Sequence, residues 1–422
     1  MTEPADDTDR FLYPNRDGAS DDAGVSRRRL LAGSVAAGMA ATAGCAGSGN
    51  DDGGQPAVVV FNTGDGTVSV VDPTTDELVT TQHVGLTSSF PSNQYTPSLA
   101  TTPDESLWLN VGRGVRAVSA GSFAERARLE TESGANWLER TPDGKHLVVS
   151  AREPTHRQFR LDADPGSEEF GEVTGEIDRT PEGGRGDNDG PGPCDVTIHP
   201  DGQYAYVPDL FGDTLTVIDV GSFEIVSQAS VDPVGDSPAR PWMGTAAWDG
   251  ETLLVEHNEG PTGTESIWDL SDPAAPRERV RLTADDGLGE RPLTSEIGPD
   301  SETGYVFTPG TEDVTVIDLV AGTVERRIDL GGRAFVGTWD PAREKLYVPV
   351  QTADEVAVID HAAGEVVSRI DVGARPYGAT AARVRPTFET ANDLATALAT
   401  LGLVGETETT YCLGDCACGH QL

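Results

Sequence analysis

A short phrase of alternating residues that ends in aspartate recurs along the chain and constrains the fold more than any other feature. Its clear copies are Val68-Ser69-Val70-Val71-Asp72, Leu215-Thr216-Val217-Ile218-Asp219, Val314-Thr315-Val316-Ile317-Asp318 and Val356-Ala357-Val358-Ile359-Asp360. Weaker copies end at Ser119, Asp162 and Asp269, so successive copies lie 42 to 57 residues apart. Alternation with a period of two is typical of strands, and this spacing is typical of four-stranded propeller blades. The repeat therefore predicts an all-β fold, a seven-bladed β-propeller.

Tight turns lie between these phrases. Each turn leads into the strand that comes before the next phrase. Examples are Thr141-Pro142-Asp143-Gly144 and His199-Pro200-Asp201-Gly202. Proline presets φ for the second turn position, while Asp and Gly accept the remaining turn geometry. The segment at residues 57–61 matches a second strand without an inner partner, and the segment at residues 376–382 matches an inner strand with nothing after it. The two are expected to complete one blade and close the ring, with the propeller spanning residues 56–385.

The charge of the chain limits its surroundings and partners. There are 70 acidic residues against 30 basic ones, a formal net charge of −40, and only two of the basic residues are lysine. Nucleic-acid binding needs clustered Lys and Arg, so nucleic acid is excluded as a partner. Molar salt shortens the Debye length to about 3 Å and would screen this self-repulsion. The composition therefore predicts a protein of a salt-loving organism, a halophilic archaeon.

Residues 1–45 have the features of an export signal. Arg27 and Arg28 precede a short Ala/Gly-rich segment, and Thr42-Ala43-Gly44 precedes Cys45. Paired arginines ahead of a weakly apolar segment are typical of twin-arginine export. Small residues before a cysteine are typical of a site at which the cysteine becomes lipidated. Residues 46–55 then form a flexible tether, and the protein is expected on the outer face of the cytoplasmic membrane, with its lipid on Cys45 in the bilayer.

The repeat resembles the YVTN-type, YncE-like family of seven-bladed propellers found on cell surfaces. The resemblance rests on the Pro-Asp-Gly turns, strands such as Lys345-Leu346-Tyr347-Val348-Pro349 and the Val-Ile-Asp phrases, although no unit spells Tyr-Val-Thr-Asn intact. It implies the fold over about four-fifths of the chain. Relatives include surface adhesive proteins, haem-handling propellers and lactonase-like enzymes, so the resemblance implies no single function.

Ligands of such propellers favour the funnel formed by the loops that lead into the inner strands and the loops between second and third strands. There the chain offers these candidates for holding an anion: Arg152, Arg240, Trp242, His257, Arg333, Arg375 and Tyr377. Arginine pairs well with anions through two parallel hydrogen bonds. The alternative is that the arginines brace neighbouring blades and that His257 is a satisfied structural group. The chain has neither a Gly-x-Ser-x-Gly nucleophile motif nor a glycine-rich phosphate loop, so an enzyme is not indicated.

Residues 386–422 form a separate tail that begins with a predicted short helix over residues 388–403. The chain ends in a Cys-rich segment with Cys412, Cys416, Cys418 and His420. These donors suit Zn or Cu, but the spacing is not that of a standard zinc finger. Outside the cell the same cysteines, or Cys194 with one of them, could instead form disulfides.

These features together predict a lipid-anchored surface module that binds another molecule. Its partner would be a surface protein, a polysaccharide or a small anionic ligand. The first alternative is a propeller that handles a metal or a haem-like cofactor through the tail or the funnel arginines. The second is a lactonase-like hydrolase.

Overall fold

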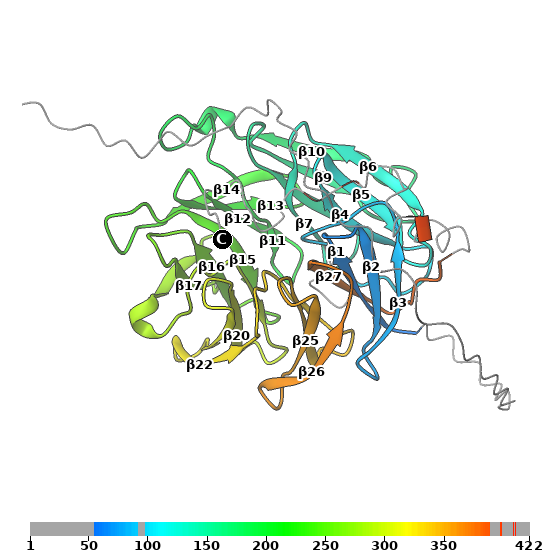
Figure 1. The fold of residues 1–422 in the computed structure, drawn as a ribbon. Helices are drawn as coiled ribbons and strands as arrows, with labels where there is room; N and C mark the ends of the chain where they lie inside the picture. Colours follow the sequence, from blue (N-terminus) through cyan, green and yellow to red (C-terminus); the bar gives the residue numbers. More distant parts are fainter. Residues whose placement is uncertain (1–54, 92–97, 389–396, 399–407, 409, 411–422) are drawn as a thin grey trace, which may run out of the picture. The chain divides into compact units, whose positions relative to one another are not determined.

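In the computed structural model, residues 55–91, 98–388, 397–398, 408 and 410 are described. The chain divides into two compact units, residues 1–50 and 51–422, and the described residues all belong to the second. Their strands form seven sheets that follow one another around a ring (Figure 1). The predicted seven-bladed β-propeller is therefore confirmed. No helix within the described residues is both long and apolar enough to cross a membrane.

Blade 1 joins strands from the two ends of the propeller. From the axis outward it consists of β27 (Pro376–Ala382), β1 (Ala57–Asn62), β2 (Thr67–Asp72) and β3 (Glu77–His83). β27 pairs antiparallel with β1, with Val59 opposite Thr380. This is the closure that the sequence predicted, and it leaves the ring without a free edge at this junction.

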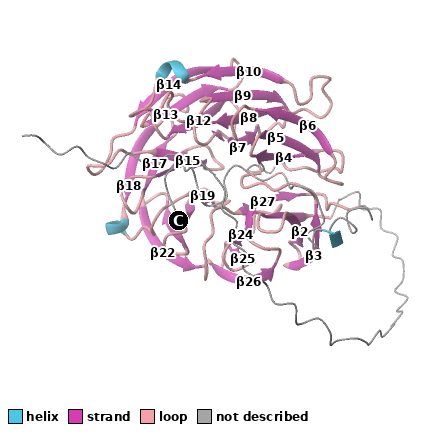
Figure 2. Ribbon diagram, turned by 45° about the horizontal axis from the view of Figure 1, so that its top comes forward, coloured by secondary structure: helices cyan, strands magenta, loops and turns pink. Residues whose placement is uncertain are grey.

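The other blades follow in chain order, each written from the axis outward. Blade 2 is β4 (Ser106–Val111), β5 (Gly114–Ser119) and β6 (Glu125–Glu130); blade 3 is β7 (Ala135–Arg140), β8 (His146–Ala151), β9 (Arg157–Asp162) and β10 (Val173–Asp178); blade 4 is β11 (Thr197–Ile198), β12 (Tyr204–Asp209), β13 (Thr214–Asp219) and β14 (Glu224–Ser230). Blade 5 is β15 (Pro241–Ala246), β16 (Thr252–His257), β17 (Thr264–Asp269) and β18 (Arg277–Leu282); blade 6 is β19 (Thr294–Ile297), β20 (Thr303–Thr308), β21 (Asp313–Asp318) and β22 (Thr323–Asp329); blade 7 is β23 (Thr338–Trp339), β24 (Lys345–Val350), β25 (Glu355–Asp360) and β26 (Glu365–Asp371). Figure 2 shows the strands as arcs around the centre, with only short helical segments between them.

The recurring aspartate ends the third strand because its carboxylate closes the turn that follows. Asp219 accepts the amide N–H of Ser222 at 2.7 Å, and Asp318 accepts that of Ala321 at 2.7 Å. These backbone hydrogen bonds favour the ionised form, so the pKa of Asp219 is lowered. Aspartate is thus required by turn geometry and not by ligand binding.

In blade 2 an asparagine side chain holds the segment that leads to the inner side of the sheet. Within the described residues, which omit 92–97, the sheet of this blade has three strands. Asn110 of β4 accepts the amide N–H of Phe90 at 2.8 Å and the hydroxyl of Ser88 at 2.7 Å through Oδ1. The segment around Phe90 is therefore fixed to β4 by a side chain.

Buried carboxyls complete the inner edges of neighbouring blades. Glu139 of blade 3 accepts the amide N–H of Ile198 at 3.2 Å, and Asp195 of blade 4 accepts that of Gly244 at 2.7 Å. Both carboxyls are fully shielded from solvent, and this desolvation raises the pKa of Glu139 and of Asp195 well above their ordinary values. Backbone donors that would otherwise face the axis without a partner are thereby satisfied.

Candidate binding face at the propeller axis

An apolar cluster fills the axis at the face where the chain leads into the inner strands. It takes a buried residue from every blade: Phe90, Trp137, Cys194, Met243, Leu293, Phe335 and Tyr377. Residues of seven different blades can meet only where the inner strands converge, so the cluster lies on the axis. Phe335 and Tyr377 stack with ring centroids 4.8 Å apart, and Phe90 meets Tyr377 edge-on at 5.7 Å.

Arginines surround this cluster at the point where the chain leads into the inner strands. Three blades repeat one arrangement: an arginine with a left-handed backbone conformation, then a proline, then a residue that belongs to the axial cluster. The three copies are Arg240-Pro241-Trp242, Arg291-Pro292-Leu293 and Arg375-Pro376-Tyr377. Their φ angles are 48°, 59° and 50°. Blade 4 places Gly192 (φ 72°) at the same point before Pro193 and Cys194. Glycine adopts this conformation readily, whereas a residue with a Cβ is strained there.

A fourth arginine, Arg333, leads into blade 7, and 39% of its side chain is exposed. Blades 5, 6, 7 and 1 thus each contribute one arginine around the axial cluster, and we call Arg240, Arg291, Arg333 and Arg375 the arginine rim. Sequence reasoning missed Arg291. The Arg-Pro dipeptide that it shares with Arg240 and Arg375 was the signal that could have found it.

The backbone amides of two rim arginines, Arg240 and Arg375, are held by carboxylates of the preceding blade. The amide N–H of Arg240 donates to Asp213 Oδ1, and that of Arg375 donates to Asp354 Oδ1, both at 2.8 Å. Arg240 and Arg375 are exposed. The guanidinium of Arg333 comes only to 4.0 Å of Glu312. The backbone of Arg240 and Arg375 is therefore fixed at the point where the chain enters the inner strand.

Two other predicted funnel residues, Trp242 and Tyr377, belong to the apolar floor beneath the rim, with 2% and 1% of their surface exposed.

Arg152 lies inside the protein. Its Nη1 approaches Cys194 Sγ at 3.6 Å, its guanidinium lies over the Phe211 ring, and it pairs with Glu153. Arg152 is fully buried and is placed to join blades 3 and 4.

His257 is also fully buried, and its position in the repeat indicates why. It ends the second strand of blade 5, and its Nε2 lies 2.6 Å from Ser266 Oγ of the third strand. Asn62 and Asp209 end the second strands of blades 1 and 4 and bond in the same way to third-strand hydroxyls. Burial lowers the pKa of His257 well below its ordinary value, so the ring is neutral at pH 7.

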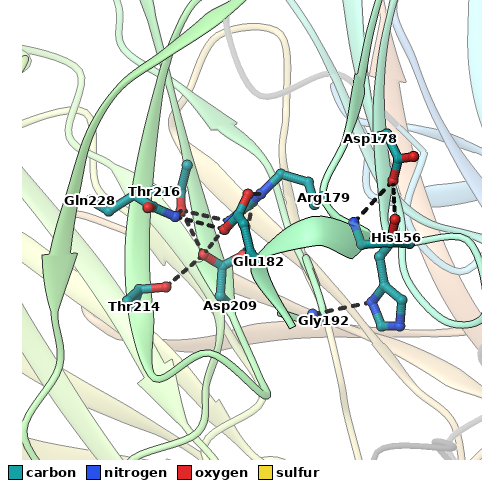
Figure 3. Close-up of polar contacts among 10 residues, drawn as sticks. His156, Asp178, Arg179, Glu182, Gly192, Asp209, Thr214, Thr216 and Gln228 are labelled. Atoms are coloured by element: carbon teal, nitrogen blue, oxygen red, sulfur yellow. Dashed lines mark hydrogen bonds and ion pairs between the residues drawn. The ribbon is translucent and has the colours of Figure 1, made fainter. Parts of the chain in front are cut away.

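A buried ion-pair network joins blades 3 and 4 beside this face (Figure 3). Arg179 donates two parallel hydrogen bonds to Asp209, at 3.0 and 2.9 Å, and both side chains are fully buried. It also donates to Glu182, which lies in the 3₁₀ turn η2 (Thr180–Glu182). Although burial disfavours its charge, the two carboxylates raise the pKa of Arg179 above its ordinary value. Burial in turn raises the pKa of Asp209. Every charge in the network has a partner. The network therefore holds blades 3 and 4 together and is not a ligand site.

His156 occupies the same seam in a left-handed conformation, with φ 48°. Its Nδ1 accepts the amide N–H of Gly192 at 3.3 Å, as Figure 3 shows. Burial lowers the pKa of His156, which keeps the ring neutral and able to accept this bond. The histidine thereby holds Gly192, the residue that replaces a rim arginine in blade 4.

Several predicted sites lie outside the described residues: Arg27, Arg28, Cys45, Cys412, Cys416, Cys418 and His420. They stay predictions. The described part of the tail includes Glu408 and Thr410, which contact blade 2 and the segment before it. Glu408 bonds to Arg116 through both carboxylate oxygens, at 3.1 and 2.8 Å, and Thr410 Oγ1 lies 2.6 Å from Ser89 Oγ. Within the described ranges, no group of three or more His, Cys, Asp and Glu side chains is arranged to hold a metal ion.

Comparison with known proteins shows the fold without a family. No protein-family model matches the chain, and no curated protein matches its sequence. Among solved structures, the periplasmic gluconolactonase of Pseudomonas aeruginosa superposes with a TM-score of 0.59 and 15% identity, over 78% of this chain and 99% of that one. A putative 6-phosphogluconolactonase of Bacteroides fragilis gives 0.60 and 16%, over 78% and 98%. Hydrazine synthase of Kuenenia stuttgartiensis gives 0.54 and 18%, over 72% and 92%.

Proposed function

We propose that this propeller is a binding module that takes an anionic ligand on the arginine rim, over the apolar axial floor. The observation that supports this most directly is the left-handed conformation of Arg240, Arg291 and Arg375. Strained residues persist where the surrounding structure over-determines them, and they concentrate at functional positions. Glycine serves at the same point in blade 4, so the propeller fold itself does not need arginine there.

The chemistry of the rim indicates the kind of ligand. Four arginines lie around the axial floor of a chain whose net charge is −40, beside carboxylates such as those of Asp213 and Asp354. Guanidinium groups pair with carboxylate or phosphate through parallel hydrogen bonds. Trp242, Phe335 and Tyr377 beneath them are almost fully buried, so they support the rim from below and leave recognition of the ligand to the arginines. The ligand expected is therefore an acidic sugar or an acidic segment of a surface polymer.

The place of action follows from the sequence features of the first 55 residues. We propose that the chain leaves the cell by the twin-arginine route and stays on the outer face of the cytoplasmic membrane through a lipid on Cys45. Its acidity would keep it soluble in molar salt. Radiolabelled lipid incorporated by the full chain, and not by Cys45→Ala, would support this placement.

Thermal unfolding with defined anions tests the binding proposal. Gluconate, 6-phosphogluconate and inorganic phosphate are added at constant salt, and we expect at least one to raise the melting temperature. Arg240→Ala combined with Arg375→Ala should abolish the rise. The control is Arg128→Ala, because Arg128 lies on the outer strand β6 and pairs there with Glu125. A rise that survives in the rim variant would contradict the proposal.

A second candidate function is hydrolysis of a sugar lactone, which the names of two structural neighbours favour. Their identities of 15% and 16% establish the fold and leave activity open. The product of such a reaction is an aldonate anion, which the same arginines would hold. Release of acid from glucono-1,5-lactone above the spontaneous rate, lost in the rim variant, would favour the hydrolase over a module that only binds.

A further inference from the structure

The seven blades align the chain with itself, and one pair of positions stands out. At the second-last residue of the second strand and its partner on the third strand, five blades carry at least one apolar residue: Phe61–Val68, Asn110–Val115, Pro208–Leu215, Phe307–Val314 and Pro349–Val356. Blade 3 has Ser150 opposite Gln158. Blade 5 has Glu256 opposite Glu265. The fold does not require two carboxyls here, because apolar pairs fill the same place elsewhere.

These two carboxyls are inside the protein and lack partners. Neither Glu256 nor Glu265 exposes any surface. No hydrogen bond reaches any of their four carboxylate oxygens from the described residues. Directly opposed residues on paired strands have their Cβ atoms about 4.5–5.5 Å apart, and like charges at that spacing repel. A buried polar group without a partner is rare in native proteins and calls for a missing atom or ion.

The charged groups around the pair do not compensate it. The nearest cation, Arg281, already pairs with Glu259 at 2.9 Å and with Glu278 at 2.8 Å. His257, next to Glu256 in the chain, is neutral because burial lowers its pKa. The other neighbouring groups are acids, since Glu296 and Asp195 both act electrostatically on Glu256 or are acted on by it. An uncharged or cationic occupant is needed at this point.

One further oxygen, on blade 6, lies beside Glu256. The hydroxyl of Ser295, in β19, lies close enough to Glu256 to lower the pKa of that carboxyl. Ser295 is 3% exposed, and its hydroxyl forms no hydrogen bond of ordinary geometry with a described residue. Blades 5 and 6 are neighbours in the ring, as the labels β16, β17 and β20 show in Figure 1. The seam between them thus holds five buried oxygens that form no hydrogen bond of ordinary geometry with the described residues.

We propose that Glu256, Glu265 and Ser295 bind a calcium ion in the seam between blades 5 and 6. All the donors are oxygens, which hard cations prefer, and Ca²⁺ takes six to eight oxygen ligands with carboxylates that can bind through both atoms. Two carboxylates of like charge are neutralised by one divalent ion. Mg²⁺ fits less well because it keeps several waters in strict octahedral geometry. The ion would replace the apolar contact that joins strands two and three in other blades.

Proton binding competes with the ion, which fixes the sign of the pH dependence. Burial raises the pKa of Glu256 to about 8 and that of Glu265 well above its ordinary value. Without calcium, the folded state therefore holds protons that the unfolded chain releases near pH 4.5. The contribution of this pair to the stability of the ion-free protein should be greatest below about pH 4.5 and fall as pH rises toward about 8. Calcium must displace these protons, so its stabilising effect should grow over the same range.

The test is thermal unfolding of the chelator-treated chain at fixed ionic strength set with choline chloride. Addition of 5 mM CaCl₂, by comparison with 5 mM MgCl₂, should raise the melting temperature by a few degrees at pH 8.5 and by less at pH 6. Glu256→Gln combined with Glu265→Gln should remove the calcium response. Gln158→Leu is the matched control, because it alters the corresponding polar pair in blade 3 and should keep the response.

Equilibrium dialysis with radioactive calcium keeps the test decisive if the glutamine variant folds poorly. Glu256→Phe with Glu265→Val copies the Phe307–Val314 pair of blade 6 and should fold while binding one calcium ion fewer. Equal binding by this variant and the unaltered chain would overturn the proposal, since the ions would then sit on surface acids. No calcium-dependent rise in melting temperature at pH 8.5 would overturn it as well and leave the pair as two carboxyls that share protons.

Discussion

Replacing Arg375 by glycine and by alanine separates the strain of its backbone from the contribution of its side chain. Both variants keep the backbone contacts, in which the amide of residue 375 donates to Asp354 and its carbonyl accepts from Thr63 N–H at 3.0 Å. The left-handed conformation costs a residue with a Cβ about 1–2 kcal/mol of folding free energy. Glycine avoids this strain but costs about 0.5–1 kcal/mol, because the unfolded chain has more conformational freedom at glycine than at alanine. The glycine variant should therefore be more stable than the alanine variant by about 0.5–1 kcal/mol.

Arg375→Ala should itself leave stability within about 0.5 kcal/mol of the unaltered chain, because its exposed side chain forms no ion pair with any described residue. Urea unfolding followed by tryptophan fluorescence at constant molar salt gives both free energies. The anion response should be weakened equally in the two variants. If Arg375→Gly is no more stable than Arg375→Ala, the left-handed backbone at residue 375 carries no conformational strain. The main support for a functional rim is then lost.

Three further perturbations test the packing that holds the binding face. Arg179→Met should lower the free energy of unfolding by about 3–5 kcal/mol, because it leaves the Asp209 carboxylate buried without its partner; Asp209→Leu in the same chain should restore much of this in urea unfolding. Deleting residues 376–388 removes the inner strand of blade 1 and should abolish the cooperative calorimetric transition, and a retained sharp transition would contradict ring closure by this strand. Arg116→Ala should reduce hydrogen-exchange protection of the Glu408 amide, which donates to the Gly85 carbonyl in the docked tail, whereas unchanged protection would mean that the ion pair does not hold it.

The blade pattern could be predicted from the sequence because local and global signals agree in it. The Val-Ile-Asp phrase combines a strand period with an aspartate that closes the next turn through the chain's own amides. Such a signal is complete within about ten residues. The contacts of Asn110 could not be predicted, since its side chain bonds to Ser88 and Phe90, about 20 residues away in the chain.

The position of the candidate site residues was harder to predict, because side-chain burial depends on neighbouring blades. Arg152 and Arg240 both adjoin loops of the same face, yet Arg152 turns inward over Phe211, while Arg240 stays exposed. Nothing within either local sequence distinguishes them. The Arg-Pro dipeptide was informative for the rim because proline fixes where the inner strand starts, and so which residue precedes the axial cluster.

Internal repetition offers a way to separate structural from functional residues without any related sequence. A residue that has chemical counterparts in several blades is explained by the fold, and His257 is such a residue, since Asn62 and Asp209 bond to third-strand hydroxyls from the same position. A residue that breaks the pattern at an energetic penalty is not explained by the fold. Glu256 and Glu265 break it by placing two carboxyls where five of the other six blades carry at least one apolar residue. Chemistry specific to this chain should therefore be sought first at positions where one blade differs from the equivalent positions of the other six.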